Sequence, residues 1–185
     1  MLKVIVLGSA AGGGFPQWNC NCENCKRVWQ EQPDVFSRTQ SSLAISVDDE
    51  NWFLLNASPD VRQQIQSNKQ LHPKMGVRHS PIVGAILTNA DVDHIGGLLT
   101  LRESHPLSIY ATSRVLDVLS QNPIFNVLNP KFVERRGLTI SQSLSLQDKE
   151  GNDTGIEIEI FPVPGKVALY LEDESKGDNF GSVPE

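Results

Sequence analysis

The feature that most constrains this chain is a group of acidic residues and one histidine directly after its most apolar central run. Residues 82–87 have the length and composition of a buried strand. Asp91, Asp93 and His94 follow within a few positions, and residues 95–101 then take up an apolar pattern of helical spacing. Polar side chains gathered where a buried strand meets a helix are costly to desolvate unless something binds them, and a metal ion is the simplest such partner.

We expect these three side chains to converge on one ion. In an extended segment Asp91 and Asp93 point to the same side, and His94 at the following turn can lie beside them. The alternative is an exposed loop in which an aspartate caps the next helix. The apolar strand before the group, and Gly96 and Gly97 followed by leucines after it, favour the metal site.

The identity of the metal decides which reaction such a site would support. Fe(II), manganese and zinc are all compatible with these donors, and a histidine and carboxylate set with open positions is the arrangement of non-haem iron oxygenases. Zinc or manganese would instead activate a water for hydrolysis, with Asp91 or Asp93 free to act as general base. Asp91, Asp93 and His94 are therefore candidate catalytic residues as well as candidate metal ligands.

A cluster of three cysteines predicts a second metal site. Cys20, Cys22 and Cys25 have a C-x-C-x-x-C spacing that lets three thiolates reach one ion. A structural zinc with three cysteines and one further ligand fits this spacing best. A redox pair or three unrelated thiols are the alternatives, but no thioredoxin-like unit surrounds the cluster. The candidates for the fourth ligand are His72, His79, His105 and a histidine beyond the last residue.

Length, charge and hydropathy narrow the class of protein. The 185 residues suffice for one domain with its own core, and a net charge of −6 without a basic run argues against a nucleic-acid partner. No window has the length and hydropathy of a transmembrane helix, so we expect no membrane partner. The chain starts in a strand-like run at 2–7 without the features of a secretory signal, and we expect a cytoplasmic protein with reduced thiols.

The glycine-rich segment 8–14 follows this first predicted strand. It nearly fits the dinucleotide-binding pattern G-x-G-x-x-G, with Ala10 in place of the second glycine. Residues 15–20 cannot form the helix whose N-terminus would face a pyrophosphate. We expect these glycines instead to let the backbone turn tightly and pass close to a site.

Alternating and apolar patterns predict the other elements. Ser58, Pro59 and Asp60 are typical of a helix start, with Ser58 as the N-cap, and Thr112 or Ser113 caps a later helix. The order of the elements fits one half of a layered α/β/β/α sandwich. Further expected strands are 41–47, 52–55, 107–111, a run around 138–140, 156–161 and 166–171, and a short helix is expected at 26–32. The loop-like end at 177–185 predicts that this single domain, 1–185, is the N-terminal part of a longer one.

The group around His94 resembles the signature of the metallo-β-lactamase superfamily, His-x-His-x-Asp-His followed by Gly-Gly at the end of a strand. Asp93, His94 and the pair 96–97 match it, whereas Asn89 and Asp91 replace the two leading histidines. The resemblance implies an α/β/β/α sandwich with the metal site at one edge of its sheets. The replaced histidines disfavour ordinary two-zinc hydrolysis. Phosphodiesterases of this superfamily carry a similar cysteine cluster, which implies a structural role for Cys20, Cys22 and Cys25.

Three longer stretches, 4–20, 55–60 and 87–94, are similar to the family of pyrroloquinoline quinone (PQQ) biosynthesis protein B. This resemblance implies a role in making PQQ, as an iron-dependent oxygenase that hydroxylates the tyrosine ring of a peptide-derived Glu–Tyr unit. The alternatives are a carrier that binds PQQ or its precursor on the way to the periplasm, and a metal-dependent hydrolase. The partner would be a small or peptide-derived molecule, and a homodimer is one option for the assembly.

Overall fold

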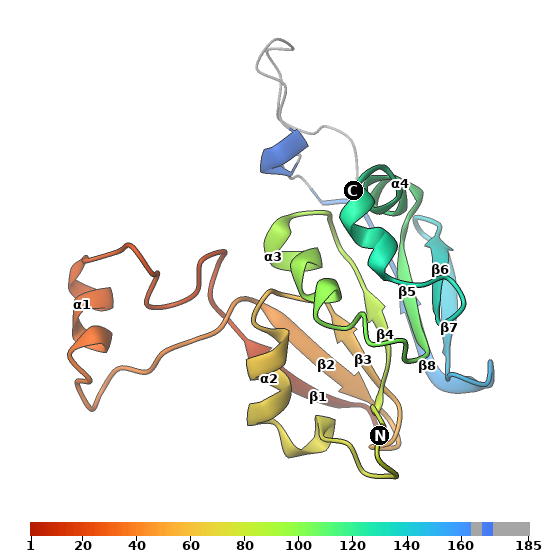
Figure 1. Cartoon of the computed structure of the whole chain (residues 1–185), viewed down its shortest axis with the longest axis horizontal. Coiled ribbons are helices and arrows are strands. Elements are labelled where there is room, and N and C mark those ends of the chain that lie inside the picture. The colour runs from red at the N-terminus through yellow and green to blue at the C-terminus, as the bar shows by residue number, and fades with distance from the viewer. Residues whose placement is uncertain (164–167, 172–185) are drawn as a thin grey trace.

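The computed structural model describes residues 1–163 and 168–171 and forms three layers (Figure 1). The middle layer is a six-stranded sheet in the order β1-β2-β3-β4-β5-β6, and a two-stranded sheet of β7 and β8 lies against one of its faces. The strands are β1 (Lys3–Gly8), β2 (Ser42–Ser46), β3 (Trp52–Leu55), β4 (Ile82–Ile86), β5 (Leu107–Thr112), β6 (Val133–Leu138), β7 (Ser143–Gln147) and β8 (Asp153–Glu159).

Helices cover the other face of the large sheet. Strands β1, β2 and β3 pair antiparallel, whereas β3, β4, β5 and β6 pair parallel and need crossover connections that the helices supply. Because parallel strands end at the same edge, the loops after β3, β4 and β5 meet there. The α-helices are α1 (Glu23–Trp29), α2 (Val61–Ser67), α3 (Val92–Ile95) and α4 (Ser113–Gln121), and the 3-10 helices are η1 (Lys69–Leu71), η2 (Gly96–Leu99), η3 (Pro123–Val127) and η4 (Leu169–Leu171).

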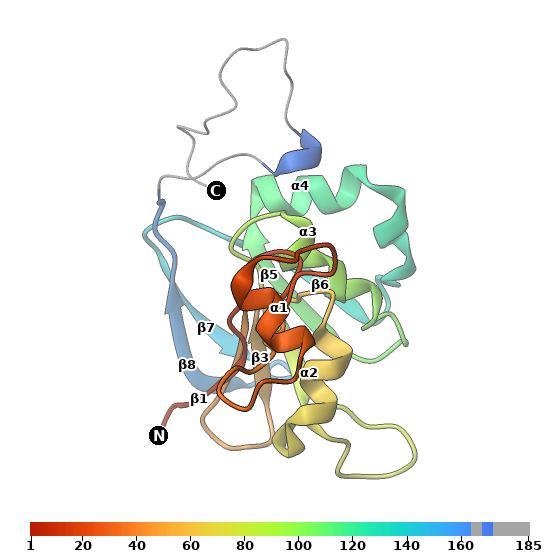
Figure 2. The same ribbon diagram turned by 90° about the vertical axis from the view of Figure 1, so that its left-hand side faces the viewer.

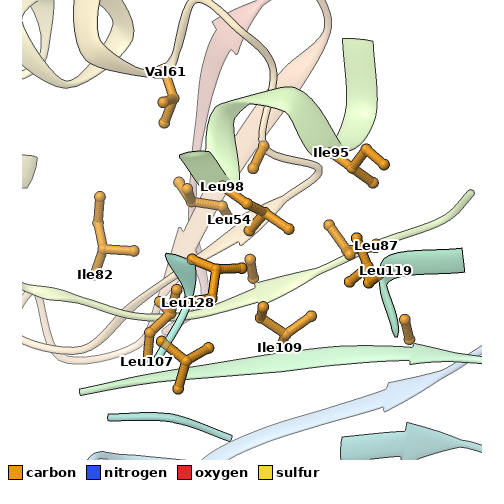
Figure 3. Packing of buried hydrophobic residues seen from close by; sticks show 14 of the residues in the cluster. Leu54, Val61, Ile82, Leu87, Ile95, Leu98, Leu107, Ile109, Leu119 and Leu128 are labelled. Atoms are coloured by element: carbon orange, nitrogen blue, oxygen red, sulfur yellow. The ribbon is translucent and has the colours of Figure 1, made fainter. Parts of the chain in front are cut away.

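Two apolar clusters hold the layers together. The larger one fills the space between the sheet and the helices, where Leu54 and Ile109 of the strands face Leu98 of η2 (Figure 3). The smaller one joins the two sheets, and its rings Phe53 and Tyr110 meet edge to face at 6.3 Å. Strands β3 to β5 are therefore covered on both faces, which explains why 82–87 is an uninterrupted apolar run.

The chain between β1 and β2 leaves the body as an arm that carries α1 (Figures 1 and 2). At its base Phe15 and Arg38 exchange two backbone hydrogen bonds, of 2.8 and 2.7 Å. Within α1 only Cys25 is buried, and Trp18, Trp29 and Phe36 of the arm are exposed. The arm has no apolar core comparable to that of the body.

The sandwich architecture and most predicted elements are confirmed. Strands β1 to β5 and β8 lie at the predicted places within a few residues. The Thr112 hydroxyl accepts a hydrogen bond from the N–H of Val115 at 3.4 Å and caps α4, as expected. No helix among the described residues is both long and apolar enough to cross a bilayer.

Several predicted elements are wrong in position. The short helix is not 26–32 but α1, which begins directly after Cys22 with an acidic residue in its first turn. The strand near 138–140 is β6, which ends at Leu138, and β7 has no counterpart among the predictions. Strand β6 contains two arginines and buries only Val133 fully, and β7 has only two leucines, of which Leu146 alone is buried, so both strands have short apolar patterns.

The expected capping by Ser58 is also wrong. Helix α2 starts at Val61 after Asp60, and no side chain caps it. The Ser58 hydroxyl instead donates to Oε1 of Gln64 at 3.1 Å, and the Asp60 carboxylate accepts the N–H of Gln40 at 2.9 Å. Tertiary partners therefore bind both polar side chains that the local pattern assigns to the helix end.

Only part of the predicted C-terminal segment lies among the described residues, and its structure differs from the prediction. Of the expected strand 166–171, residues 166–167 lie outside the described residues, and 169–171 form the 3-10 helix η4. The expected loop 177–185 also lies outside the described residues.

Candidate metal centre

Asp91, Asp93 and His94 lie at the carboxyl-terminal edge of the parallel strands, directly after β4. Asp91 precedes α3 with an extended backbone (φ −62°, ψ 147°), and Asp93 and His94 belong to α3 itself. The expectation of one extended segment is therefore wrong. The three side chains nevertheless converge, because one potential ligand atom from each lies within 4.8 Å of the others.

The geometry also shows that the Asp91 side chain does not cap α3. Its backbone oxygen accepts hydrogen bonds from the N–H groups of His94 and Ile95, at 2.8 and 3.0 Å, as a helix start requires. Its carboxylate makes no capping hydrogen bond. The neighbouring amide oxygen of Asn89 accepts the N–H of Asp91 at 2.9 Å. The Asp91 carboxylate is therefore available as a ligand, whereas Asn89 shapes the turn.

Asp93 and His94 contact each other directly. Oδ1 of Asp93 lies 3.2 Å from Nδ1 of His94, and the two side chains are 24% and 20% exposed. A carboxylate in contact with a ring nitrogen restrains the orientation of the imidazole. The two carboxylates and the imidazole are suitable donors for Fe(II), manganese or zinc, and their partial exposure leaves room for further ligands.

Two glycines bring this helical turn against the loop after β3. A Cβ atom on Gly97 would lie 2.2 Å from the backbone oxygen of Ser58, so only glycine permits this approach. The N–H of Gly97 donates to the oxygen of Ala57 at 2.8 Å, and the N–H of Ala57 donates to the oxygen of His94 at 2.7 Å. Gly97 therefore lets the turn that contains His94 pack directly against the loop after β3.

Asn56 contributes to the same scaffold. Its amide oxygen accepts the N–H and the hydroxyl of Thr88 at 2.9 and 3.1 Å, which ties the end of β3 to the loop after β4. Its backbone has a φ of 62°, a left-handed conformation that asparagine tolerates better than most residues. Asn56 therefore positions the loop that contains the three candidate ligands.

Two segments distant in sequence reach the candidate site. A Cβ atom on Gly12 would lie 3.3 Å from Oδ2 of Asp93, so the glycine-rich segment does pass close to a site, as expected. The Tyr170 hydroxyl donates to the backbone oxygen of Ala90 at 2.6 Å. Sequence reasoning does not find Tyr170, because no local pattern links it to a loop that lies 80 residues earlier.

The cysteines form a second, separate group. The sulfur atoms of Cys20, Cys22 and Cys25 lie within 4.8 Å of one another. None of the chain's four histidines joins them, and the expected fourth ligands His72 and His79 have other contacts. His72 Nε2 lies 3.1 Å from the oxygen of Gln66, and His79 Nδ1 accepts the N–H of Lys74 at 3.1 Å.

The cysteine thiols influence one another's protonation. The backbone N–H of Cys25 and hydrogen bonds with the Cys20 and Cys25 thiols lower the pKa of Cys22. The backbone N–H of Gln17 acts to lower the pKa of Cys25, but burial and the two neighbouring thiols raise it overall. A bound zinc would keep all three cysteines deprotonated, because it binds thiolates.

The comparison with known proteins agrees with this architecture. Residues 51–184 match the family described as the beta-lactamase superfamily domain. The chain belongs to this superfamily. Its superfamily relatives include coenzyme PQQ synthesis protein B from Methylorubrum populi, which is 52% identical over 174 residues, or 94% of this chain and 56% of that protein. The corresponding protein from Xanthomonas oryzae pv. oryzae is 48% identical over 184 residues, or 100% of this chain and 59% of that protein.

Solved structures of the superfamily show the same fold. The crystal structure of Zn(2+)-bound PqqB from Methylobacterium extorquens has a TM-score of 0.87 and 51% identity, and the match covers 95% of this chain and 56% of that one. A diphosphatase of the PhnP family, at 23% identity and a TM-score of 0.62, shares the fold over 79% of this chain and 54% of that one. The chain is thus a homologue of PQQ synthesis protein B and spans a little over half the length of these relatives.

Proposed function

We propose that this chain provides the metal-binding part of an oxygenase of PQQ synthesis, which uses iron to hydroxylate the tyrosine ring of a peptide-derived Glu–Tyr precursor. Its identity of 48–52% to proteins named for PQQ synthesis supports the pathway. The donor set supports the chemistry, because histidine and carboxylate ligands with open positions suit Fe(II) and O2. A small peptide-derived substrate fits the acidic chain better than a nucleic acid.

The observation that carries this proposal is the convergence of Asp91, Asp93 and His94 at the sheet edge, with the Asp91 carboxylate not used for capping. These three side chains would hold the ion, and Asp93 would also orient the imidazole of His94. When bound, iron supplies the activation of O2. One oxygen atom enters the ring C–H bond and the other leaves as water, with two electrons and two protons from an external reductant.

Zinc is proposed for the cysteine group. Cys20, Cys22 and Cys25 supply three thiolates, and Zn(2+) is the ion bound in the similar structure from Methylobacterium extorquens. The position of the group in the arm, away from the sheet edge, suits a structural role rather than a catalytic one.

Removing single ligands tests the catalytic assignment. We expect Asp93→Ala and His94→Ala, loaded with Fe(II) without oxygen, to lose iron and at least 100-fold of the O2 uptake seen with a Glu–Tyr substrate and ascorbate. Zinc at the cysteines should remain. Asp117→Ala, at an exposed aspartate of α4, is the matched control and should keep both metals. Unchanged iron content and turnover in the ligand variants would contradict the assignment.

The same preparation separates the alternative functions. Tight binding of PQQ with no O2 uptake under any metal would support a carrier. Release of product without O2 consumption, in the presence of zinc or manganese, would support a hydrolase. Only substrate-dependent O2 uptake that requires iron supports the oxygenase.

A further inference from the structure

We propose that Gly12 is a positioning residue of the metal site, which keeps open the space that the Asp93 carboxylate occupies. The inference rests on the proposed metal binding by Asp91, Asp93 and His94. It concerns the loop between β1 and the arm, which is distant in sequence from these ligands.

The nearest contacts of this position are all with Asp93. The three atoms nearest to a Cβ built on Gly12 all belong to Asp93: Oδ2 at 3.3 Å, Cγ at 3.5 Å and Cβ at 3.7 Å. The first of these distances is shorter than an ordinary carbon–oxygen contact, so a methyl group here would displace the carboxylate by a few tenths of an ångström. An alanine at position 12 would therefore press first on the side chain of Asp93.

The loop cannot simply move away to relieve the contact. The N–H groups of Ser9 and Ala10 both donate to the oxygen of Thr39, at 3.0 and 2.9 Å. On the C-terminal side, Phe15 and Arg38 exchange backbone hydrogen bonds of 2.8 and 2.7 Å, and within the turn the N–H of Gly14 donates to the oxygen of Ala11 at 3.0 Å. Because the backbone on both sides of Gly12 is held, the Asp93 side chain must move instead.

The Asp93 side chain cannot rotate without losing its contact with His94. Its Oδ1 atom contacts Nδ1 of His94 at 3.2 Å, while Oδ2 is the atom beside Gly12. A rotation that moves Oδ2 away from a new methyl group also turns Oδ1 away from the imidazole. One added methyl group would therefore disturb the positions of two of the three candidate ligands.

The backbone conformation of Gly12 allows alanine to be introduced there without backbone strain. Gly13 and Gly14 have φ values of +95° and +75°, so alanine at either position would strain the backbone. Gly12 is not among the glycines with a left-handed φ, so Gly12→Ala adds volume without this strain. Gly137 of β6 is the matched control, because it too lacks a left-handed φ and a Cβ there meets nothing within 4 Å.

The experiment measures metal affinity rather than turnover. The probe is Mn(II) titrated by calorimetry or electron paramagnetic resonance into the zinc-loaded protein, with thermal melting to show that each variant is folded. We expect Gly12→Ala to weaken Mn(II) binding roughly tenfold, the range found when a group supporting a metal ligand is changed. Gly137→Ala should bind as the wild type does, and zinc at the cysteines should be unchanged in both.

A double-mutant cycle shows whether Gly12 acts through Asp93. In the Asp93→Asn background, which keeps the side-chain shape and a weaker oxygen ligand, Gly12→Ala should change residual Mn(II) affinity by less than about twofold. An equal effect in both backgrounds would overturn the inference, and so would unaltered affinity in folded Gly12→Ala.

A wild-type protein that binds no Mn(II) or Fe(II) at Asp93 would overturn the metal site itself, and the inference with it. Normal wild-type binding with an unaffected Gly12→Ala would overturn the inference alone.

Discussion

Asp48 organises the turn between β2 and β3. Its carboxylate accepts the N–H groups of Glu50 and Asn51, both at 2.8 Å, and the Ser46 hydroxyl at 3.0 Å. Burial acts to raise the pKa of Asp48, but the hydrogen bonds from Asn51, Glu50 and Ser46 outweigh it and lower the pKa to about 2. The ionised carboxylate is thus the form that the fold favours.

This depressed pKa predicts how stability depends on pH. The folded protein holds Asp48 ionised down to about pH 2, whereas the ordinary value is 3.8. Its contribution is therefore complete above about pH 4 and is lost as the pH falls toward 2. We expect Asp48→Asn to cost about 1 kcal/mol at pH 7, a value reduced for the exposure of the side chain, and almost nothing near pH 2.

Urea unfolding of both proteins at several pH values measures this difference. Asp117→Asn, at an exposed position on α4, is the control for the loss of one carboxylate outside this turn. A constant difference between Asp48→Asn and the wild type from pH 7 to pH 2 would show that the charge has no part in the turn.

At the scale of elements, the arm that carries α1 depends on its sulfur atoms more than on packing. Cys25 is the buried residue of α1, and large apolar side chains nearby, Trp18 and Trp29, are exposed. A short helix without an apolar partner is marginal by itself. Metal binding by Cys20, Cys22 and Cys25 would therefore stabilise the arm directly.

We expect Cys22→Ser to lose the zinc of this group and to lower the melting temperature by several degrees, because a structural ion contributes its binding free energy to folding. Zinc content and a thermal melt measure both effects. Asn24→Ser, an exposed change in the same turn, is the control and should leave both unchanged. A melting curve of Cys22→Ser that overlays the wild type would refute the structural role.

At the scale of the whole molecule, Tyr170 connects η4 to the loop of the candidate ligands. Its hydroxyl donates to the oxygen of Ala90, a residue that is only 3% exposed. Loss of this donor would leave a buried carbonyl with less hydrogen bonding, next to Asp91. We expect Tyr170→Phe to cost about 1 kcal/mol of stability and to weaken Mn(II) binding several-fold.

The chain's other tyrosine provides the control for this experiment. The Tyr110 hydroxyl accepts the N–H of Gln147 at 3.2 Å between the two sheets, away from the candidate ligands. Tyr110→Phe should also lower stability but leave Mn(II) affinity as in the wild type. Equal metal affinity in the two folded variants would mean that Tyr170 supports the fold and not the metal site.

Local patterns predict the parts of this fold in which one stretch of chain decides its own structure. The apolar run 82–87 becomes β4, and Thr112 caps α4, because strand burial and helix capping involve neighbouring residues. The same approach fails for Ser58, which binds Gln64 instead of capping α2. It also fails for β7, where Leu144 stays exposed and Leu146 is buried only through its contact with the large sheet.

For the candidate site, the sequence alone determined which residues are available and where they lie. An apolar strand followed by Asp91, Asp93 and His94 places two carboxylates and an imidazole at a sheet edge, because the spacing is short and the backbone carries them there. The C-x-C-x-x-C spacing gathers three sulfur atoms for the same reason. The tertiary structure decided that the Asp91 side chain caps nothing, that Gly12 lies against Asp93 and that Tyr170 binds the backbone of Ala90. Those contacts join residues 81 and 80 positions apart in the sequence, and their geometry depends on how the layers pack rather than on any nearby residue.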